Sequence, residues 1–380
     1  MTPHDGDIAL NLIPGIGFAR YTALLEYFGS AEEVFSASRS DLEQVPRLGR
    51  KLAEEIAAFN AAEALENELA AAGKGGVNIF TLSDPDYPAI LRDLSDPPLC
   101  IYWRGHLPED GLPLVAIVGS RRLSSYGARM TDAIASEAAA ADFGVVSGLA
   151  LGADTLAHEA AVKAGKPTFG VIGAGMMNFY PQENIELARR MIDSGGAVLS
   201  EFPLGFPIQR TNFPRRNRIV AALCRAVIVT EAGLKSGALI TAKLAAELGR
   251  EVFAVPGHAD NAQAQGCHRL IKDGAGLIEN FADVLEALGF GHAAEEPDLP
   301  GFGADELNFA APPEEVAVMK VVRNRGEADL ETLREATGFS TGELLSVLMT
   351  LELKSLVRRG PDQRYRPTRG QKGLAEQEDE

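Results

Sequence analysis

A cluster of basic residues contrasts with the acidic charge of the whole chain, whose formal net charge is −17 over 380 residues. Four arginines fall within nine residues: Arg210, Arg215, Arg216 and Arg218. A local excess of positive charge against the overall sign is typical of a surface that binds phosphates. Asn212, Phe213 and Asn217 lie in the same stretch, and a phenylalanine ring can stack on a nucleic-acid base. We interpret this segment as a nucleic-acid site; the alternative is a solvated helix start whose arginines pair with nearby carboxylates.

A second candidate site follows an apolar run at residues 114–118. The loop reads Gly119-Ser120-Arg121-Arg122. Glycine lets the backbone approach an anion, and a helix that begins after the loop adds the positive end of its dipole. Ser120 offers a hydroxyl, and Arg121 can hold a phosphate through two parallel hydrogen bonds. The pattern therefore indicates a phosphate site, with a plain strand-to-helix turn as the alternative.

Two more loops have the same strand–loop–helix context. In the first, Gly148 precedes Asp154, and His158 follows four residues later. That spacing can support acid–base chemistry, but we favour a structural role in which Asp154 caps the helix and His158 is a satisfied core residue.

The other loop contains Lys235, Ser236 and Gly237, which can meet a further phosphate. Glu231, at the start of this loop, can accept a hydrogen bond from a base or sugar. The plainer interpretation, which we prefer, is that Glu231 orders the arginine cluster. Neither loop contains the residues of a recognised hydrolytic motif.

Several other kinds of site are disfavoured. The run Gly173-Ala174-Gly175-Met176-Met177-Asn178 lacks the third glycine of a dinucleotide fingerprint, and no Gly-Lys-Ser or Gly-Lys-Thr of a P-loop occurs. The three cysteines are widely spaced and form no Cys-x-x-Cys pair, so we expect no metal site and no disulfide framework. We therefore predict no cofactor and no metal.

These loops need a scaffold, and the central part of the chain predicts one. Short β-branched runs alternate with alanine-rich helical runs, a pattern typical of a parallel sheet covered on both faces. The predicted strands are Leu114–Val118, Gly144–Ser147, Thr168–Ile172, Ala197–Ser200, Ala226–Thr230 and Glu251–Val255. The predicted helices between them are Tyr126–Ala141, Asp154–Ala164, Asn184–Ile192 and Ala238–Leu248.

The whole chain divides into five predicted parts, and its fold class is α/β. Residues 1–76 form a helical domain with two similar turn-and-helix segments, which resemble a pair of helix-hairpin-helix (SAM-like) motifs. Residues 77–290 form the Rossmann-like core and carry the candidate DNA site. A linker rich in Gly, Pro, Asp and Glu spans 291–312, a winged helix of three helices and a hairpin spans 313–368, and a disordered tail spans 369–380.

The two flanking domains are less suited to phosphate binding than the core. Glu32, Glu33, Glu43, Glu54 and Glu55 surround the N-terminal hairpins. The expected recognition helix of the winged helix has two glutamates and no basic residue, although its wing is rich in arginine. We favour protein contacts for the winged helix, and leave both possibilities open for the hairpins. With no signal-peptide pattern and no run of about 18 apolar residues, we expect a cytoplasmic protein.

The ordered motifs of the core resemble the DNA-processing protein A (DprA/Smf) family. They are Val118–Arg121, Ser147–Asp154 with His158, Tyr180-Pro181 with Asn184, Ser200–Gly205, Phe213–Ile219, Glu231–Thr241 and Val252–Gly257. The resemblance implies sequence-independent binding of single-stranded DNA, loading of the RecA recombinase in natural transformation, homodimerisation and no enzymatic activity. It assigns DNA binding to Ser120, Arg121, Arg216, Asn217, Arg218, Ser236 and Gly237, and more loosely to Arg210. His268 departs from the asparagine that is usual there.

Two rival functions remain open at this point. Nucleotide phosphoribohydrolases share such a core, but they carry a Gly-Gly-x-Gly-Thr loop that is absent here. The second rival function is that of a regulator that binds duplex DNA through the winged helix. The acidic recognition helix argues against it.

Overall fold

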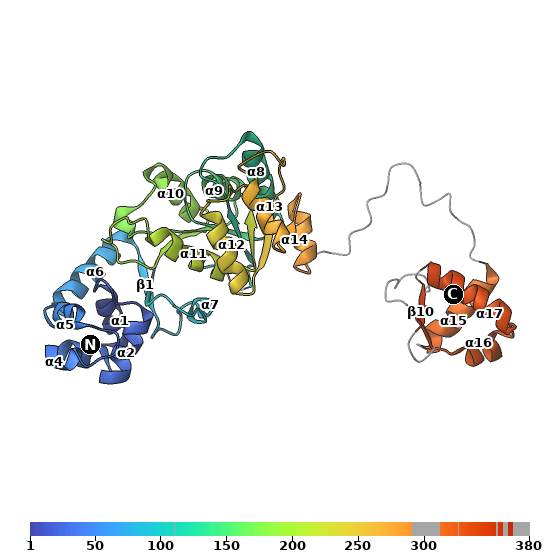
Figure 1. Ribbon diagram of the computed structural model, residues 1–380, viewed down its shortest axis with the longest axis horizontal. Coiled ribbons are helices and arrows are strands. Elements are labelled where there is room, and N and C mark those ends of the chain that lie inside the picture. Colours follow the sequence, from blue (N-terminus) through green and yellow to red (C-terminus); the bar gives the residue numbers. More distant parts are fainter. Residues whose placement is uncertain (110, 291–311, 326, 355, 360–363, 368–380) are drawn as a thin grey trace, which may run out of the picture. The chain divides into compact units, whose positions relative to one another are not determined.

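A computed structural model describes residues 1–109, 111–290, 312–325, 327–354, 356–359 and 364–367. The chain forms two compact units, Met1–Ala293 and Ala294–Glu380, which are described separately below (Figure 1). The predicted linker, apart from residue 312, and the predicted tail at 369–380 lie outside the described residues.

The first unit is built on a nine-stranded sheet in the order β1-β2-β6-β5-β4-β3-β7-β8-β9. The strands from β6 to β9 in that order run parallel, whereas β2 is antiparallel to β6 and β1 is antiparallel to β2. The bounds are β1 Asn78–Thr81, β2 Cys100–Gly105, β3 Leu114–Val118, β4 Gly144–Ser147, β5 Thr168–Val171, β6 Ala197–Ser200, β7 Ala226–Val229, β8 Glu251–Ala254 and β9 Gly276–Leu277. All six predicted strands are confirmed, each within one residue, while β1, β2 and β9 were not predicted.

Helices cover both faces of this sheet, because successive residues of each buried strand point to opposite sides. In β3, Val115 and Ile117 pack with α8 and α9, whereas Ala116 and Val118 pack with α11 and α12. The helices are α7 Ala89–Arg92, α8 Ser125–Ala140, α9 Ala153–Lys163, α10 Ile185–Asp193, α11 Asn212–Leu223, α12 Ala238–Glu247, α13 Gln265–Lys272 and α14 Phe281–Ala287. The parallel α/β core that the sequence predicts is therefore present (Figure 1).

The N-terminal domain is helical, as predicted, with its own apolar core. Its helices are α1 Pro3–Asn11, α2 Phe18–Phe28, α3 Ala31–Ser36, α4 Arg39–Leu42, α5 Arg50–Ala57 and α6 Ala61–Gly75. The two similar segments form equivalent turns before α2 and α5. Gly15 has a φ of 93° in the first turn, and Arg47 has a φ of 67° in the second. Arginine thus occupies a left-handed position that favours glycine.

The described residues of the second unit form three helices, α15 Pro313–Arg325, α16 Leu330–Thr337 and α17 Thr341–Leu353. Strands β10 Val357–Arg359 and β11 Tyr365–Pro367 pair antiparallel, and Val318, Leu333 and Leu348 lie in the shared apolar core. This arrangement is the predicted winged helix. The predicted Gly360-Pro361 turn lies outside the described residues.

Three further features bear on the classes of site considered above. Cys100, Cys224 and Cys267 are buried and free. No described group of three or more His, Cys, Asp or Glu residues is placed to hold a metal ion. Within the same described ranges, no helix has the length and apolar character needed to cross a membrane.

Candidate nucleic-acid interface

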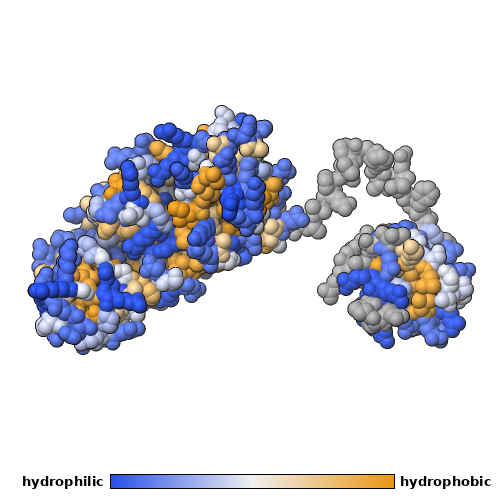
Figure 2. All heavy atoms as spheres, viewed as in Figure 1, coloured by the Kyte–Doolittle hydropathy of each residue, from blue (hydrophilic) through white to orange (hydrophobic). Residues whose placement is uncertain are grey.

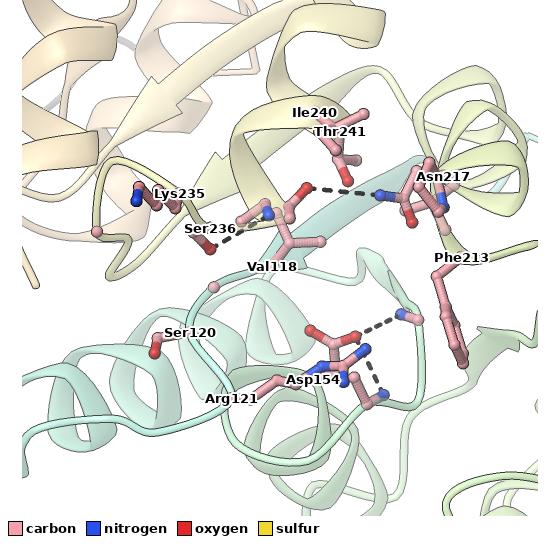
Figure 3. Close-up of a pocket in the computed structure, with 18 of the residues that line it drawn as sticks. Val118, Ser120, Arg121, Asp154, Phe213, Asn217, Lys235, Ser236, Ile240 and Thr241 are labelled. Atoms are coloured by element: carbon pink, nitrogen blue, oxygen red, sulfur yellow. Dashed lines mark hydrogen bonds between the residues drawn. The ribbon is translucent and has the colours of Figure 1, made fainter. Parts of the chain in front are cut away.

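A pocket of about 640 Å³ opens where the strand order of the sheet reverses. From β3 the chain continues to β4 on one side, whereas β7 leads to β8 on the other. The loops after β3 and β7 therefore diverge, and such a crevice at the carboxyl ends of parallel strands is where open α/β sheets bind ligands. The lining comes from these two loops, from the loop after β4 and from the first turns of α11 (Figure 3).

Most of the predicted site residues line this pocket. They are Gly119, Ser120, Arg121, Arg122, Gly148, Asp154, Phe213, Arg216, Asn217, Lys235, Ser236 and Gly237. The predicted residues outside the lining are Arg210, Asn212, Arg215, Arg218, His158 and Glu231. Segments that are up to 118 residues apart in the sequence, from 119 to 237, thus meet at one edge of the sheet.

The loop after β3 is held by backbone contacts and leaves its arginine side chains outward. The Ser120 amide donates to the Glu231 carbonyl over 2.7 Å, and the Ser120 hydroxyl accepts from the Arg122 amide over 3.1 Å. A β-carbon on Gly119 would lie only 2.8 Å from the Ala153 side chain, which explains the glycine. Arg121 is exposed, and its guanidinium lies 5.4 Å from the centre of the Phe213 ring. No described carboxylate forms an ion pair with Arg121 or Arg122.

Glu231 orders this first loop rather than the arginine cluster. It is 2% exposed, and its carboxylate accepts from the Ser124 amide over 2.8 Å and from the Ser124 hydroxyl over 2.5 Å. Ser124 in turn caps the start of α8. The preferred interpretation, that Glu231 orders the arginines, is therefore corrected: the carboxylate stabilises the beginning of α8.

A buried charge network shapes the loop after β4. Arg216 is 4% exposed and donates to the Gly148 carbonyl over 2.5 Å, while the Asp154 carboxylate accepts from the amides of Gly148 and Ala150. Burial lowers the pKa of Arg216 to about 10, so the side chain stays charged at neutral pH. Burial also raises the pKa of Asp154, and the positive charge of Arg216 opposes that rise. A β-carbon on Gly148 would lie 2.4 Å from the Arg216 guanidinium, so only glycine fits.

His158 lies in the core beneath this loop. It is fully buried, and its Nδ1 lies 2.7 Å from the Thr168 hydroxyl, which itself donates to the Val145 carbonyl. Nδ1 must therefore carry the hydrogen. Burial lowers the pKa of His158 to about 3, so the ring is neutral at neutral pH. Its Nε2 has no partner among the described residues. These contacts agree with the structural role that we favour for His158. The prediction that Asp154 caps the helix is wrong, because Gly152 is the N-cap of α9 and the Asp154 carboxylate instead binds amides of the preceding loop.

The arginines of α11 separate into two groups. Arg216 faces the pocket, whereas Arg215 and Arg218 both bind Glu201, at 3.0 Å and 2.6 Å. The Glu201 side chain is 1% exposed. A buried carboxylate holds Arg215 and Arg218 on another side of the helix from Arg216, and neither lines the pocket, so their assignment to DNA binding stays a prediction. Asn212 is also buried, and its amide donates to the Pro207 carbonyl over 3.4 Å.

The loop after β7 presents a cation and a helix start to the pocket. Lys235 is exposed and forms no ion pair with any described carboxylate. Helix α12 follows Gly237, and the Ala238 amide in its first turn donates to the Ser236 hydroxyl over 3.3 Å. The Asn217 amide approaches the Gly237 carbonyl at 3.5 Å, which links α11 to this loop (Figure 3). The positive end of the α12 dipole therefore faces the same space as Arg121 and Lys235.

Comparison with known proteins agrees with this arrangement. The family model of DNA recombination-mediator protein A matches residues 78–289, which contain the sheet and every loop of the pocket. This chain belongs to that family. A model of the SAM-like helix-hairpin-helix tandem matches residues 8–59, so the two predicted hairpins are confirmed.

Relatives cover the recombination-mediator core and, in one case, nearly the whole chain. Protein Smf of Synechocystis is 33% identical over 94% of this chain and 97% of its own length. DNA processing protein DprA of Streptococcus pneumoniae is 42% identical over 56% of this chain and 74% of its own length. An X-ray structure of DprA from Streptococcus pneumoniae has a TM-score of 0.64 and 34% identity, and the match covers 75% of this chain and 98% of that one.

Some residues of this recombination-mediator site were not predicted. Ala262 and Gln263, from the loop after β8, complete the pocket wall, and Gln263 lies 3.4 Å from the Ser120 hydroxyl. The feature of the sequence that could have indicated these two residues is their position after a predicted strand. Glu201 was part of a motif noted in the sequence but was not assigned a role. His268, which departs from the family pattern, lies 2.9 Å from the Gly257 carbonyl and so contacts the backbone after β8.

Proposed function

We propose that this chain binds single-stranded DNA without sequence preference at the pocket between β3 and β7. The observation that carries the proposal is the set of exposed cations without a described carboxylate partner: Arg121, Arg122 and Lys235. They stand beside the start of α12, in a chain whose net charge is −17. Unpaired cations and backbone amides that converge on one crevice suit a phosphate backbone, which offers the same contacts at every nucleotide.

Phe213 favours a single strand over a duplex. Its ring is partly exposed in the pocket and lies under the Arg121 guanidinium. An aromatic face can stack on any base, provided that the base is not already stacked inside a duplex. Contacts to the phosphate backbone and to the faces of bases carry no direct sequence information, so binding should depend on backbone charge and stacking rather than on sequence.

Membership of the recombination-mediator family supports a further step, in which the bound strand is passed to the RecA recombinase during natural transformation. We propose that the chain acts there as a homodimer in the cytoplasm and without chemical catalysis. The test of the RecA step is assembly of RecA on a strand already coated with single-strand-binding protein, measured by RecA ATPase rate. An unchanged rate on adding this protein would contradict loading.

The binding proposal is tested by fluorescence anisotropy with a labelled oligothymidine and a matched duplex, each titrated at several salt concentrations. We expect tighter binding of the single strand, and an affinity that falls as salt rises because bound phosphates release counterions. A preference for the duplex would support a regulator that acts through the winged helix. Release of free base from nucleoside monophosphates would instead support a phosphoribohydrolase.

A further inference from the structure

A second aromatic side chain extends the pocket surface along the sheet. The Tyr180 ring lies with its centre 6.0 Å from the centre of the Phe213 ring, and the two rings are inclined by 53°. Tyr180 is 41% exposed, although it is a large and mostly apolar residue. Its hydroxyl forms no hydrogen bond to any described residue. Tyr180 thus offers an open ring face beside the aromatic residue of the proposed site, without a visible role in the fold.

The strand order places Tyr180 at one end of the side chains that we propose to contact the ligand. Lys235 follows β7, Arg121 follows β3 and Tyr180 follows β5, and these strands lie in the order β7-β3-β4-β5. Neighbouring strands are about 4.8 Å apart, so β7 and β5 are separated by roughly 14 Å. These side chains therefore follow the carboxyl edge of the sheet. The cations Lys235 and Arg121 lie after β7 and β3, and the aromatic rings lie further along the edge, towards β5.

We infer that Tyr180 is a second base-stacking residue, and that the strand crosses the sheet edge from Lys235 over Phe213 to Tyr180. The inference rests on the proposed function, since it assigns an adjacent nucleotide of the same bound strand. One base stacks on Phe213 and a neighbouring base stacks on the exposed face of Tyr180. Stacking on an aromatic ring tolerates every base, so this contact adds affinity without sequence preference.

The test compares Tyr180→Ala and Tyr180→Phe, with Tyr27→Ala as a matched control. Tyr27 is a tyrosine of the helical domain that is 52% exposed and contacts the Phe28 ring, so it resembles Tyr180 in exposure and in aromatic pairing. The Kd of each variant is measured for labelled oligothymidine and for a strand of equal length and charge that lacks bases. A 2-aminopurine base, moved along the strand, reports stacking by quenching of its fluorescence.

For oligothymidine, we expect Tyr180→Ala to raise the Kd about five- to 150-fold, the range measured for loss of one stacked base. Tyr180→Phe and Tyr27→Ala should bind like the unaltered chain. The Kd for the strand without bases should not change in any variant, and one 2-aminopurine position should lose its quenching in Tyr180→Ala alone.

Normal oligothymidine binding by Tyr180→Ala would overturn this inference and leave the proposed function intact. An equal loss on both strands would overturn it as well, because the residue would then act on the backbone or on the fold. If the unaltered chain failed to bind any single strand, the proposed function and this inference would both be overturned.

Discussion

Two groups of basic side chains lie at the same edge of the sheet, yet their surroundings differ. Arg121 and Lys235 are exposed at the pocket and have no described carboxylate partner. Arg215 and Arg218 are held by Glu201, whose side chain is 1% exposed. In the sequence, Arg215 and Arg218 belong to the densest basic cluster, and Lys235 stands alone. The density of positive charge along the chain therefore does not show which cations a buried carboxylate holds and which remain exposed without one.

The surface of the first unit shows why such a difference matters. Figure 2 shows hydrophilic residues over much of the visible face of the first unit, and hydrophobic residues that gather in several places, the most extended of them near the middle of that face. An exposed cation that pairs with a carboxylate gains little stability from the pair. A cation without such a partner remains available to an incoming phosphate.

The largest expected effect concerns Glu201. Replacing Glu201 by Gln should lower the free energy of unfolding by about 3–5 kcal/mol, because Arg218, with only 11% of its side chain exposed, would keep only the 54% exposed Asp96, 3.8 Å away, as a counter-charge. Urea denaturation measures the change. The control is Glu186→Gln, which breaks an exposed pair with Arg189 and should cost less than about 1 kcal/mol. If the two variants had the same free energy of unfolding, the buried ion pair would contribute no more to stability than the exposed pair, and the prediction would be wrong.

The next effect concerns the pocket cations. Replacing Arg121 by Ala should raise the Kd for oligothymidine about ten- to 100-fold, because a phosphate contact and the guanidinium above Phe213 are both lost. The slope of log K against log salt should become less negative by about 0.7, the value for one phosphate contact on a single strand. Stability should be unchanged. Arg129→Ala, which removes an exposed arginine from α8, serves as the control, and an equal loss in both variants would contradict the assignment.

A smaller effect should appear in the dependence of stability on pH. The pKa of His158 is about 3 in the folded chain and about 6.5 when unfolded, so the unfolded state takes up this proton first as the pH falls. The contribution of His158 to the free energy of unfolding is therefore complete above about pH 6.5, and it is lost progressively as the pH falls towards 3. Between pH 7 and 5.5 the folded state should lose about 1 kcal/mol from this group. In urea titrations, the free energy of unfolding of His158→Gln should fall correspondingly less over that interval. If it fell as much as that of the unaltered chain, a neutral, buried His158 would be contradicted.

The smallest effect is expected for Arg215, which is 46% exposed although it contacts Glu201. Arg215→Ala should change the Kd for oligothymidine less than about twofold and the free energy of unfolding by less than about 1 kcal/mol, because Arg218 still neutralises Glu201. Anisotropy and urea denaturation measure the two values. A tenfold loss of affinity would show that Arg215 binds the strand, and the division between the two groups of cations would then be wrong.

The local pattern of the sequence was sufficient to predict the parallel sheet. Strands β3 to β7 are short and mostly apolar runs that are buried on both faces, and this pattern is visible without tertiary contacts. Strands β1 and β2 were missed because they join the sheet antiparallel after a helical domain, outside the repeating strand–helix order. Strand β9 has only two residues, too few for any periodicity.

By itself, the sequence determined that loops rich in glycine and serine follow buried strands, and so most of the pocket lining could be named in advance. Only the tertiary structure decided which side chains remain available to a ligand. Arg216 is fixed on Gly148, Arg218 is fixed on Glu201, and Glu231 binds Ser124 instead of an arginine. The physical reason is that each of these contacts joins residues that are 17 to 107 positions apart in the sequence. The local spacing of residue types does not encode which charged side chain meets which partner over such a separation.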